Sequence, residues 1–314
     1  MHIDCWLDIS KPIASPSLTN PDVRKPALSG LRRFWSREIL FIRGMLGLGD
    51  NIYARAFVKK HQGAYLETPW PQLYSDIDVK CVRPYTQLRT QAKNVQRPAQ
   101  WHKPFGGGQL RIAYGQMPII QGLRQAFRCE PGAFDLPDFG PSPVNGRYVL
   151  VRPATVRAEW RADTRNPLPE YIASAAEEMR RRGWKVVSVA DLEPGKEWAL
   201  VPLPPADIQF HKGELPVEQL LALLQHADAV IGGIGWIVPA AIAAKVPAWI
   251  ICGGQGGYNS PEHITDKCMD LSRITFAVPD RFCRCTLKQH TCDKRIADHD
   301  ARFAAWADRL PALV

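Results

Sequence analysis

Short apolar runs alternate with helical patterns along the first part of the chain. The run 38–44 ends at a glycine, and a glycine turn then leads into residues 51–61, whose apolar positions recur with helical spacing. Further apolar runs predict strands at 63–67, 76–82 and 109–114, and a helical pattern covers 118–129. This part of the chain therefore predicts strands interleaved with helices.

A second series of the same kind follows a break in the pattern. The stretch 137–147 holds three prolines and two glycines, a composition typical of a linker. Beyond it, we expect strands at 148–153, 184–190, 228–233 and 246–254, and helices at 169–183, 216–227 and 236–245. Alternating strands and helices favour parallel sheets. Two such series predict an α/β protein with two Rossmann-like domains facing a cleft, with ligands at the carboxyl ends of the strands.

These patterns divide the chain into four parts. Residues 1–37 are rich in proline, serine and arginine and predict an N-terminal arm, which is followed by a first Rossmann-like domain over 38–140. The second domain covers 145–297. Residues 298–314 predict a final helix with Phe303, Trp306 and Leu310 on one face.

Composition and charge narrow the class of protein. The chain has 314 residues, 46% of them hydrophobic, and a formal net charge of +9. A basic surface favours polyanionic partners such as nucleotides, nucleic acid or anionic lipid headgroups. The apolar stretch 232–257 is interrupted by Pro239, Lys245 and Pro247, so it does not predict a membrane span. We expect a cytoplasmic protein without a secretory signal, whose basic face could bring it to the inner membrane or to DNA.

The turn after the first strand carries the first candidate chemistry. Gly47 and Gly49 allow a tight turn and a close approach of the backbone to a ligand, and Asn51 follows in the same loop. Asp50 lies at the start of the helix and has two interpretations. It either caps the helix or acts as a general base that takes a proton from an attacking hydroxyl. The turn lacks the lysine and the serine or threonine of a phosphate-binding P-loop.

The loop after the first strand of the second domain is basic. Arg152, Arg157 and Arg165 lie there, with Thr155 between them. Arginines at the carboxyl end of a strand suit a diphosphate group. The alternative is a solvated loop whose charges stay in water.

Two glycine clusters frame the apolar stretch near the end of the second series. The first lies between a strand and a helix, where backbone amides and the helix N-terminus form an anion site. The second follows the next strand, and an acidic residue that could bind a sugar hydroxyl comes shortly after it. The residues that we expect at this ligand site are Gly232, Gly233, Gly235, Trp236, Gly253, Gly254 and Glu262.

Three segments together resemble glycosyltransferase family 9, the heptosyltransferase-like enzymes of GT-B fold. They are ILFIRGMLGLGDNIYARAFV, YVLVRPATVRAEWRADTRNPLPEYI and LPVEQLLALLQHADAVIGGIGWIVPAAIAAKVPAWIICGG, in this order over residues 38–265. The third departs from the family, which usually has Asp-Thr-Gly-x-x-His where this chain has GGIGWIVP. The resemblance therefore implies the reaction type and leaves the donor open.

By this resemblance, the protein transfers a sugar from a nucleotide-sugar donor to a hydroxyl, with Asp50 as general base and no catalytic metal. Arg152, Thr155 and Arg165 match donor-phosphate positions, and the final helix is of a kind that often crosses back onto the first domain. The acceptor is lipopolysaccharide core or, as the basic and aromatic segment 89–108 would suit equally well, DNA with hydroxymethylated bases. A third alternative is a non-catalytic relative that binds nucleotides or nucleic acid.

Cysteines crowd the C-terminal region outside this resemblance. Cys283, Cys285, His290 and Cys292 could form a Cys₃His structural zinc site. The Cys-x-Cys spacing is tighter than the usual one. Free thiols and a disulfide that involves Cys268 are the alternatives.

Overall fold

The structure is a computed structural model that describes residues 39–105, 107–289 and 291–311. The predicted N-terminal arm and His290 lie outside the described residues. Residues 38–314 form one compact unit. Residues 39–140 are the N-terminal half, and residues 145–311 are the C-terminal half. The division into domains at this boundary stays a prediction.

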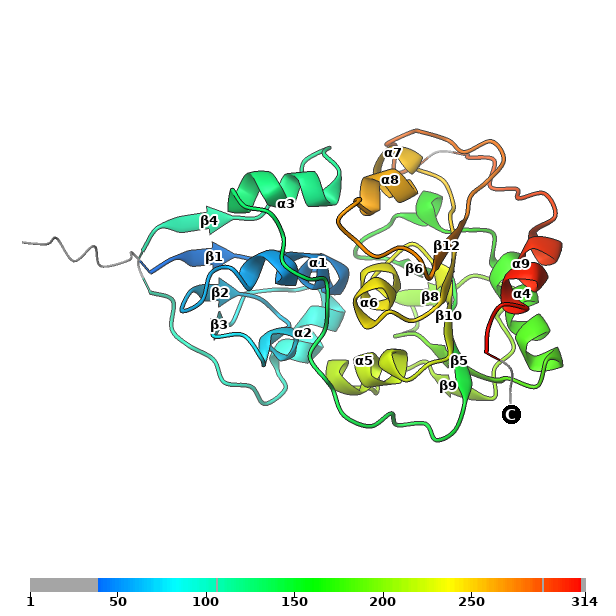
Figure 1. The fold of residues 1–314 in the computed structure, drawn as a ribbon, viewed down its shortest axis with the longest axis horizontal. Coiled ribbons are helices and arrows are strands. Elements are labelled where there is room, and N and C mark those ends of the chain that lie inside the picture. Colours follow the sequence, from blue (N-terminus) through cyan, green and yellow to red (C-terminus); the bar gives the residue numbers. More distant parts are fainter. Residues whose placement is uncertain (1–38, 106, 290, 312–314) are drawn as a thin grey trace, which may run out of the picture. The chain divides into compact units, whose positions relative to one another are not determined.

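The N-terminal half contains a parallel sheet of four strands in the order β3-β2-β1-β4. The strands are β1 (Phe41–Arg43), β2 (Tyr65–Glu67), β3 (Lys80–Val82) and β4 (Gln109–Arg111). The helices are α1 (Leu48–Val58), η1 (Pro71–Tyr74), α2 (Arg89–Val95) and α3 (Ile119–Phe127). In Figure 1, β1 and β4 point toward the C-terminal half, so that their carboxyl ends and the start of α1 lie on that side.

The C-terminal half contains a parallel sheet of six strands in the order β12-β11-β10-β5-β7-β9. These are β5 (Tyr148–Arg152), β7 (Lys185–Val189), β9 (Ile208–Phe210), β10 (Ala229–Gly233), β11 (Ala248–Ile251) and β12 (Ile274–Ala277). Its longer helices are α4 (Pro169–Arg181), α5 (Val217–Gln225), α6 (Ile237–Ala244) and α9 (His299–Ala307). The short elements are β6 (Thr155–Arg157), β8 (Glu197–Ala199), η2 (Asp163–Arg165), α7 (Gly256–Asn259) and α8 (Pro261–Ile264).

The two parallel sheets confirm the predicted α/β class. The central strands of the second sheet are buried on both faces, which is why they read as continuous apolar runs. Along β5, Tyr148 and Leu150 belong to one apolar core, and Val149 and Val151 belong to another. The first core continues through α5 and α6 into the N-terminal half.

The final helix packs differently from the prediction. The second core joins α4, α9 and the outer face of β11, where the ring of Trp249 contacts Phe303 and Trp306 at centroid distances of 5.5 and 5.6 Å. Figure 1 shows α9 beside α4, at the end of the molecule away from the first sheet. Residues 299–307 therefore do not cross back onto the N-terminal half, because their apolar face is already covered by the second sheet.

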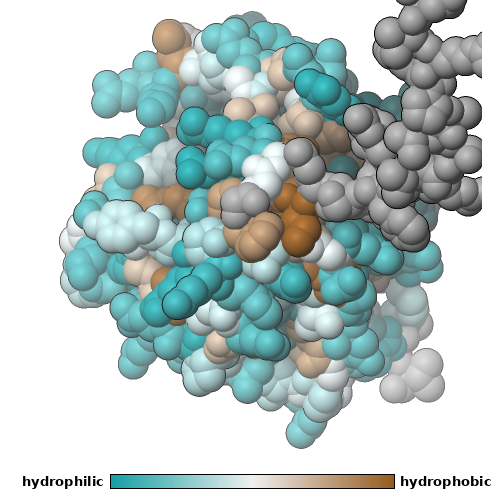
Figure 2. Space-filling model, turned by 90° about the vertical axis from the view of Figure 1, so that its left-hand side faces the viewer, coloured by the Kyte–Doolittle hydropathy of each residue, from teal (hydrophilic) through white to brown (hydrophobic). Residues whose placement is uncertain are grey.

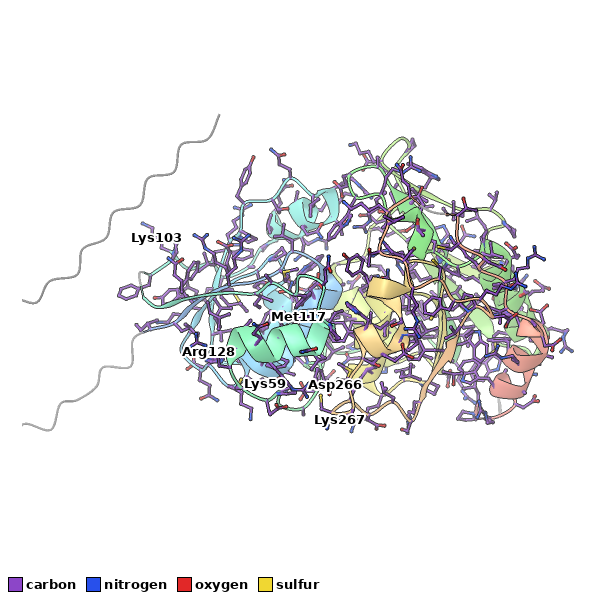
Figure 3. All side chains as sticks on the ribbon, turned by 90° about the horizontal axis from the view of Figure 1, so that it is seen from above. Lys59, Lys103, Met117, Arg128, Asp266 and Lys267 are labelled. Atoms are coloured by element: carbon purple, nitrogen blue, oxygen red, sulfur yellow. The ribbon has the colours of Figure 1, made fainter. Side chains whose placement is uncertain are left out.

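Contacts between the halves lie at the centre and on both sides of it. At the centre, α1 packs against α6, and a Cβ at Gly49 would lie 3.2 Å from the Cα of Trp236. On one side, Arg89 of α2 pairs with acidic residues that follow β7. On the other, Arg124 of α3 makes a bidentate ion pair with Asp266 at 2.7 and 3.1 Å, and Figure 3 shows Asp266 beside that helix.

The face of the N-terminal half seen in Figure 2 is largely hydrophilic, and its hydrophobic residues form small areas. None of the helices in the described part of the chain has the length and apolar character needed to span a bilayer.

Candidate active site

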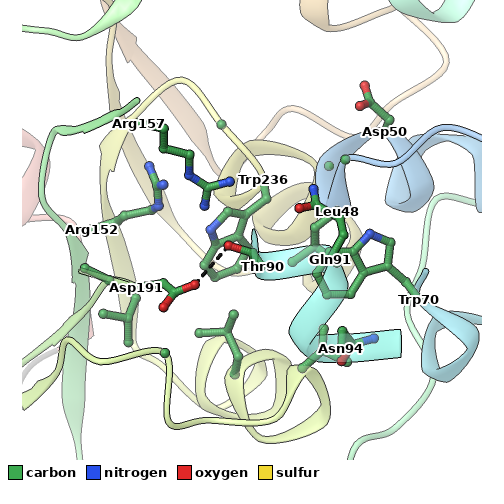
Figure 4. Close-up of a pocket in the computed structure, with 18 of the residues that line it drawn as sticks. Leu48, Asp50, Trp70, Thr90, Gln91, Asn94, Arg152, Arg157, Asp191 and Trp236 are labelled. Atoms are coloured by element: carbon green, nitrogen blue, oxygen red, sulfur yellow. Dashed lines mark hydrogen bonds between the residues drawn. The ribbon is translucent and has the colours of Figure 1, made fainter. Parts of the chain in front are cut away.

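A cavity of about 350 Å³ lies between the two halves. Its N-terminal wall is formed by the turn before α1, by Trp70 and by α2, and its C-terminal wall by the ends of β5, β7 and β10 and the start of α6. Figure 4 shows Arg152 and Arg157 on one side of this pocket and Leu48, Gln91 and Trp70 on the other. The pocket thus lies at the carboxyl ends of strands, where parallel sheets bind their ligands.

Asp50 lines the pocket at the third position of α1. It does not cap the helix, since the cap position is Gly47 and has no side-chain hydrogen bond. Among the described residues, no group donates a hydrogen bond to its carboxylate. Burial raises the pKa of Asp50 from 3.8 to about 6, although the positive charge of Arg165 opposes the shift. The carboxylate is therefore poised to exchange a proton near neutral pH.

The turn that carries Asp50 is held in place by hydrogen bonds of the next residue, Asn51. The amide of Asn51, which is 1% exposed, donates to the carbonyl oxygens of Met45 and Gly47 at 2.7 and 2.8 Å. Its own oxygen accepts a hydrogen bond from Thr68 at 2.7 Å. A Cβ at Gly47 would collide with the Asp50 carboxylate, so a larger residue there would displace this side chain. The turn therefore orients Asp50 before any ligand arrives.

Three arginines face Asp50 from the C-terminal half: Arg152 at the end of β5, Arg157 on β6 and Arg165 in η2. Burial, with repulsion from Arg157, lowers the pKa of Arg152 to about 10, and the same two causes lower the pKa of Arg165. Both side chains therefore stay protonated at neutral pH in a desolvated position. Such a group of cations is suited to a diphosphate.

Glu197 on β8 balances part of this charge. Its side chain is 1% exposed and lies 2.7 Å from Nε of Arg157 and 3.0 Å from a guanidinium nitrogen of Arg89. Its other oxygen, Oε1, is buried without a hydrogen-bond partner among the described residues. Since β6 and β8 pair so that Arg157 lies opposite Glu197, this two-stranded sheet fixes the position of the guanidinium.

The start of α6 completes the C-terminal wall. Gly235 and Trp236 line the pocket directly after β10, where the helix N-terminus presents unpaired backbone N–H groups. Trp236 and Pro239 also pack against Gly49 of α1. The apolar residues that replace the usual polar motif therefore form part of the contact between the halves.

Several predicted site residues do not line the pocket: Asn51, Thr155, Gly232, Gly233, Gly253, Gly254 and Glu262. The loop role of Asn51 and the donor-binding roles of the others stay predictions. Some of them support residues that do line it. A Cβ at Gly253 would collide with the backbone oxygen of Arg165, and the carbonyl of Thr155 accepts a hydrogen bond from Asn166 at 2.8 Å. Glu262 is exposed and lies 3.4 Å from Arg284.

The contribution of α2 to the pocket wall was not predicted from the sequence. Thr90, Gln91, Lys93 and Asn94 line the pocket, although the segment 89–108 was interpreted as suited to a DNA acceptor. Arg89 lies 2.7 Å and Lys93 2.9 Å from Asp191, across the gap between the halves. Hydrogen bonds from Lys93, Arg89 and Thr90 outweigh burial and hold the pKa of Asp191 below its usual value. Figure 4 shows the bond from Thr90 to Asp191.

The cysteine cluster lies behind the arginine wall, not in the pocket. The Sγ atoms of Cys283, Cys285 and Cys292 lie within 4.8 Å of one another, with 3.7 Å between the last two. A Cβ at Gly254 would lie 2.5 Å from the sulfur of Cys292, so the second glycine cluster supports this segment. The cysteines in the described residues, Cys268 included, form no disulfide. Three converging thiols are a ligand set that suits a soft metal ion.

Two parallel sheets that face a shared pocket define a GT-B fold, the class that the sequence motifs implied. No known sequence family and no curated protein matches the chain. Solved structures do match. The chain is similar to the iron-containing dodecameric heptosyltransferase TibC in complex with ADP-D-β-D-heptose, with 15% identity, a TM-score of 0.54, and 86% of this chain and 76% of that chain covered.

A second structure gives the same result. It is the iron-containing dodecameric glycosyltransferase TibC from enterotoxigenic E. coli H10407, with 15% identity, a TM-score of 0.55, and 87% of this chain and 76% of that chain covered. The likeness to heptosyltransferases is thereby confirmed at the level of the fold.

Proposed function

We propose that the protein is a glycosyltransferase that moves a sugar from a nucleotide-sugar donor to an acceptor hydroxyl. One observation carries this proposal: a carboxylate with a pKa of about 6 lines the same pocket as three partly buried arginines. A base on one wall and a diphosphate site on the other are the two elements that direct sugar transfer needs.

In the proposed mechanism, the acceptor hydroxyl loses its proton to Asp50. Its oxygen attacks the anomeric carbon of the donor, and the bond from that carbon to the diphosphate oxygen breaks. Arg152, Arg157 and Arg165 and the N-terminus of α6 stabilise the negative charge that develops on the diphosphate. The product is the glycosylated acceptor, with the nucleotide diphosphate as leaving group.

The donor is proposed from the neighbour that binds one. TibC was solved with ADP-D-β-D-heptose, so this nucleotide sugar is the first donor to test. Lipopolysaccharide core, an anionic acceptor, suits the net charge of +9. The similarity to TibC does not support a DNA acceptor. A non-catalytic relative remains the competing proposal, and the unpaired Asp50 is the residue that separates the two.

The test is nucleotide release from a panel of nucleotide sugars. We expect the wild-type protein to release ADP from ADP-heptose, and Asp50→Asn to reduce the rate by about 10³-fold, within the range for a general base. Asp138→Asn, an exposed carboxylate outside the pocket, serves as the matched control. The enzyme proposal fails if no donor is turned over, or if Asp50→Asn is as active as the control.

We also propose that the cysteine cluster holds a structural metal. Cys283, Cys285 and Cys292 would be three ligands, and His290 is the predicted fourth. A backbone hydrogen bond from Cys285 lowers the pKa of Cys283, which favours the thiolate that metals bind. The metal would hold together a segment whose Cys283 and Cys292 lie against Gly256 and Gly254.

Metal analysis of the purified protein tests this site. We expect about one zinc or iron per chain, lost in Cys292→Ser and kept in Cys268→Ser, whose thiol is exposed and distant from the cluster in the sequence. A metal-free protein under reducing conditions, or equal metal content in both variants, contradicts the proposal.

A further inference from the structure

Gln91 of α2 has a buried oxygen without a partner. The residue is 4% exposed and lines the pocket. Its Nε2 donates to the backbone oxygen of Leu46 at 3.2 Å, whereas its Oε1 has no hydrogen-bond partner among the described residues. A buried amide oxygen left in this state is unfavourable for the fold. Its position in the pocket points to a ligand.

The orientation of this amide is determined by its surroundings. The carbonyl of Leu46 can only accept, and it also receives a hydrogen bond from Nε1 of Trp70 at 2.9 Å. If the amide were rotated by 180°, Oε1 of Gln91 would face the carbonyl oxygen of Leu46, and two acceptors cannot hydrogen-bond to each other. Oε1 therefore remains an acceptor directed away from Leu46, and a ligand that satisfies it has to donate a hydrogen bond.

Gln91 belongs to the same wall as Asp50. Leu46 begins the turn that leads to Asp50, and Trp70, which is 3% exposed, lines the pocket next to it. Figure 4 shows Gln91 between Leu48 and Trp70, with the arginines on the other side of the pocket. The donor diphosphate is assigned to the arginine wall, so a ligand group at Gln91 belongs to the acceptor.

We propose that Gln91 is a specificity-determining residue that accepts a hydrogen bond from a second hydroxyl of a sugar acceptor. This hydroxyl is a different one from that which Asp50 deprotonates, so the two residues together select acceptors with at least two hydroxyls. The inference rests on the proposed function and deepens it. Trp70 offers an apolar ring surface on the same wall, a type of contact suited to the C–H face of a sugar.

The experiment measures binding and does not depend on turnover. Methyl α-mannopyranoside and its four monodeoxy derivatives are titrated by ligand-observed NMR against wild type and Gln91→Met, with ADP present. In Gln91→Met, Trp70 still donates to Leu46, so we expect the variant to fold. Gln96→Met, an exposed position at the end of the same helix, is the control.

We expect one deoxy derivative to bind the wild type about tenfold more weakly than the parent sugar, the size of one lost hydrogen bond. Against Gln91→Met the two should bind equally, and Gln96→Met should behave as the wild type. The inference is overturned if no sugar binds the wild type, or if every derivative shows the same loss in wild type and Gln91→Met.

Two further arms separate the outcomes. N-acetylserine methylamide is the second probe: Gln91-dependent binding of this peptide without sugar binding would overturn the sugar acceptor. ADP alone is titrated against all variants, and we expect equal affinity throughout. If ADP fails to bind the wild type, the proposed function fails, while the deoxy-sugar comparison still decides the role of Gln91.

Discussion

The two walls of the pocket differ in how their charges are compensated. The C-terminal wall gathers three arginines, with Glu197 paired to one of them and no carboxylate within ion-pair distance of Arg152 or Arg165 among the described residues. The N-terminal wall presents Asp50, whose carboxylate accepts no hydrogen bond from the described residues. One wall therefore has an excess of buried positive charge, and the other has a carboxylate with a raised pKa.

The difference assigns a role to each wall. Buried arginines remain charged, so the C-terminal wall can be neutralised only by a bound anion. Asp50 can be neutralised by a proton, so its charge changes during a reaction. An anion site and a proton acceptor on facing walls separate donor binding from acceptor activation, and each of the following changes affects one wall at a time.

The largest effect is expected at the arginine wall. Arg152→Gln removes a desolvated cation from the diphosphate site, and we expect kcat/KM for the donor to fall by roughly 10²- to 10³-fold. Steady-state kinetics of nucleotide release measure this. Arg181→Gln, an exposed position on α4, is the matched control and should be neutral. Equal activity of the two variants would remove Arg152 from the donor site.

The pH dependence comes next and reports on the opposite wall. Since Asp50 acts as a base only when ionised, and its pKa is about 6, activity should fall by about a hundredfold between pH 7 and pH 4. The measurement is kcat/KM as a function of pH, which reports the pKa of the free enzyme, with the fold checked by circular dichroism. In Asp50→Asn this acid limb should disappear from the residual activity. An unchanged limb in the variant would assign it to another group.

A third prediction concerns stability. The pKa of Asp50 is raised in the folded state, so ionisation is unfavourable there and the penalty is present in full above about pH 6. The shift corresponds to roughly 3 kcal/mol, and because the residue is partly exposed we expect Asp50→Asn to stabilise the protein by about 2 kcal/mol at pH 8. The gain should vanish below about pH 4, where both states are protonated. Urea unfolding at the two pH values measures it, and a destabilised variant at pH 8 would contradict it.

The smallest effect is expected for the ion pairs that join α2 to the C-terminal half. Arg89→Gln breaks the ion pairs of α2 with Asp191 and Glu197, and we expect a loss of about 1–2 kcal/mol because these groups are mostly buried. Arg97→Gln on the same side of the pocket, for which no ion pair is found, is the control. Urea unfolding checks both variants. A stability loss that is equal in the two would show that α2 does not hold the halves together.

Much of the fold was predictable because its signals are local. The glycine turn and helical spacing around residues 44–58 and the apolar runs of β5, β10 and β11 identified the central strands and the helices that follow them. The short strands β6, β8, β9 and β12 were missed, since three or four residues do not establish a period. Helix α2 was missed because its polar face contacts the other half and therefore resembles a solvated surface.

The candidate site, like the fold, was only partly predictable from the sequence. Asp50 and the arginine loop follow from strand–turn–helix order, since the carboxyl ends of parallel strands collect ligand-binding residues. The second glycine cluster also has a packing role that was not predicted. Gly253 and Gly254 allow close packing against the backbone near Arg165 and against Cys292, contacts between segments distant in the sequence.

By itself, the amino-acid sequence determined the α/β class, the order of the elements, the glycine turn with Asp50 and the excess of basic residues. These depend on residue type and short spacing. Only the tertiary structure decided that Glu197 balances Arg157, that α2 reaches across to Asp191, and that Gln91 has a buried oxygen without a partner among the described residues. The reason is physical: burial and ion pairing are properties of neighbours in space, and these neighbours come from both halves of the chain.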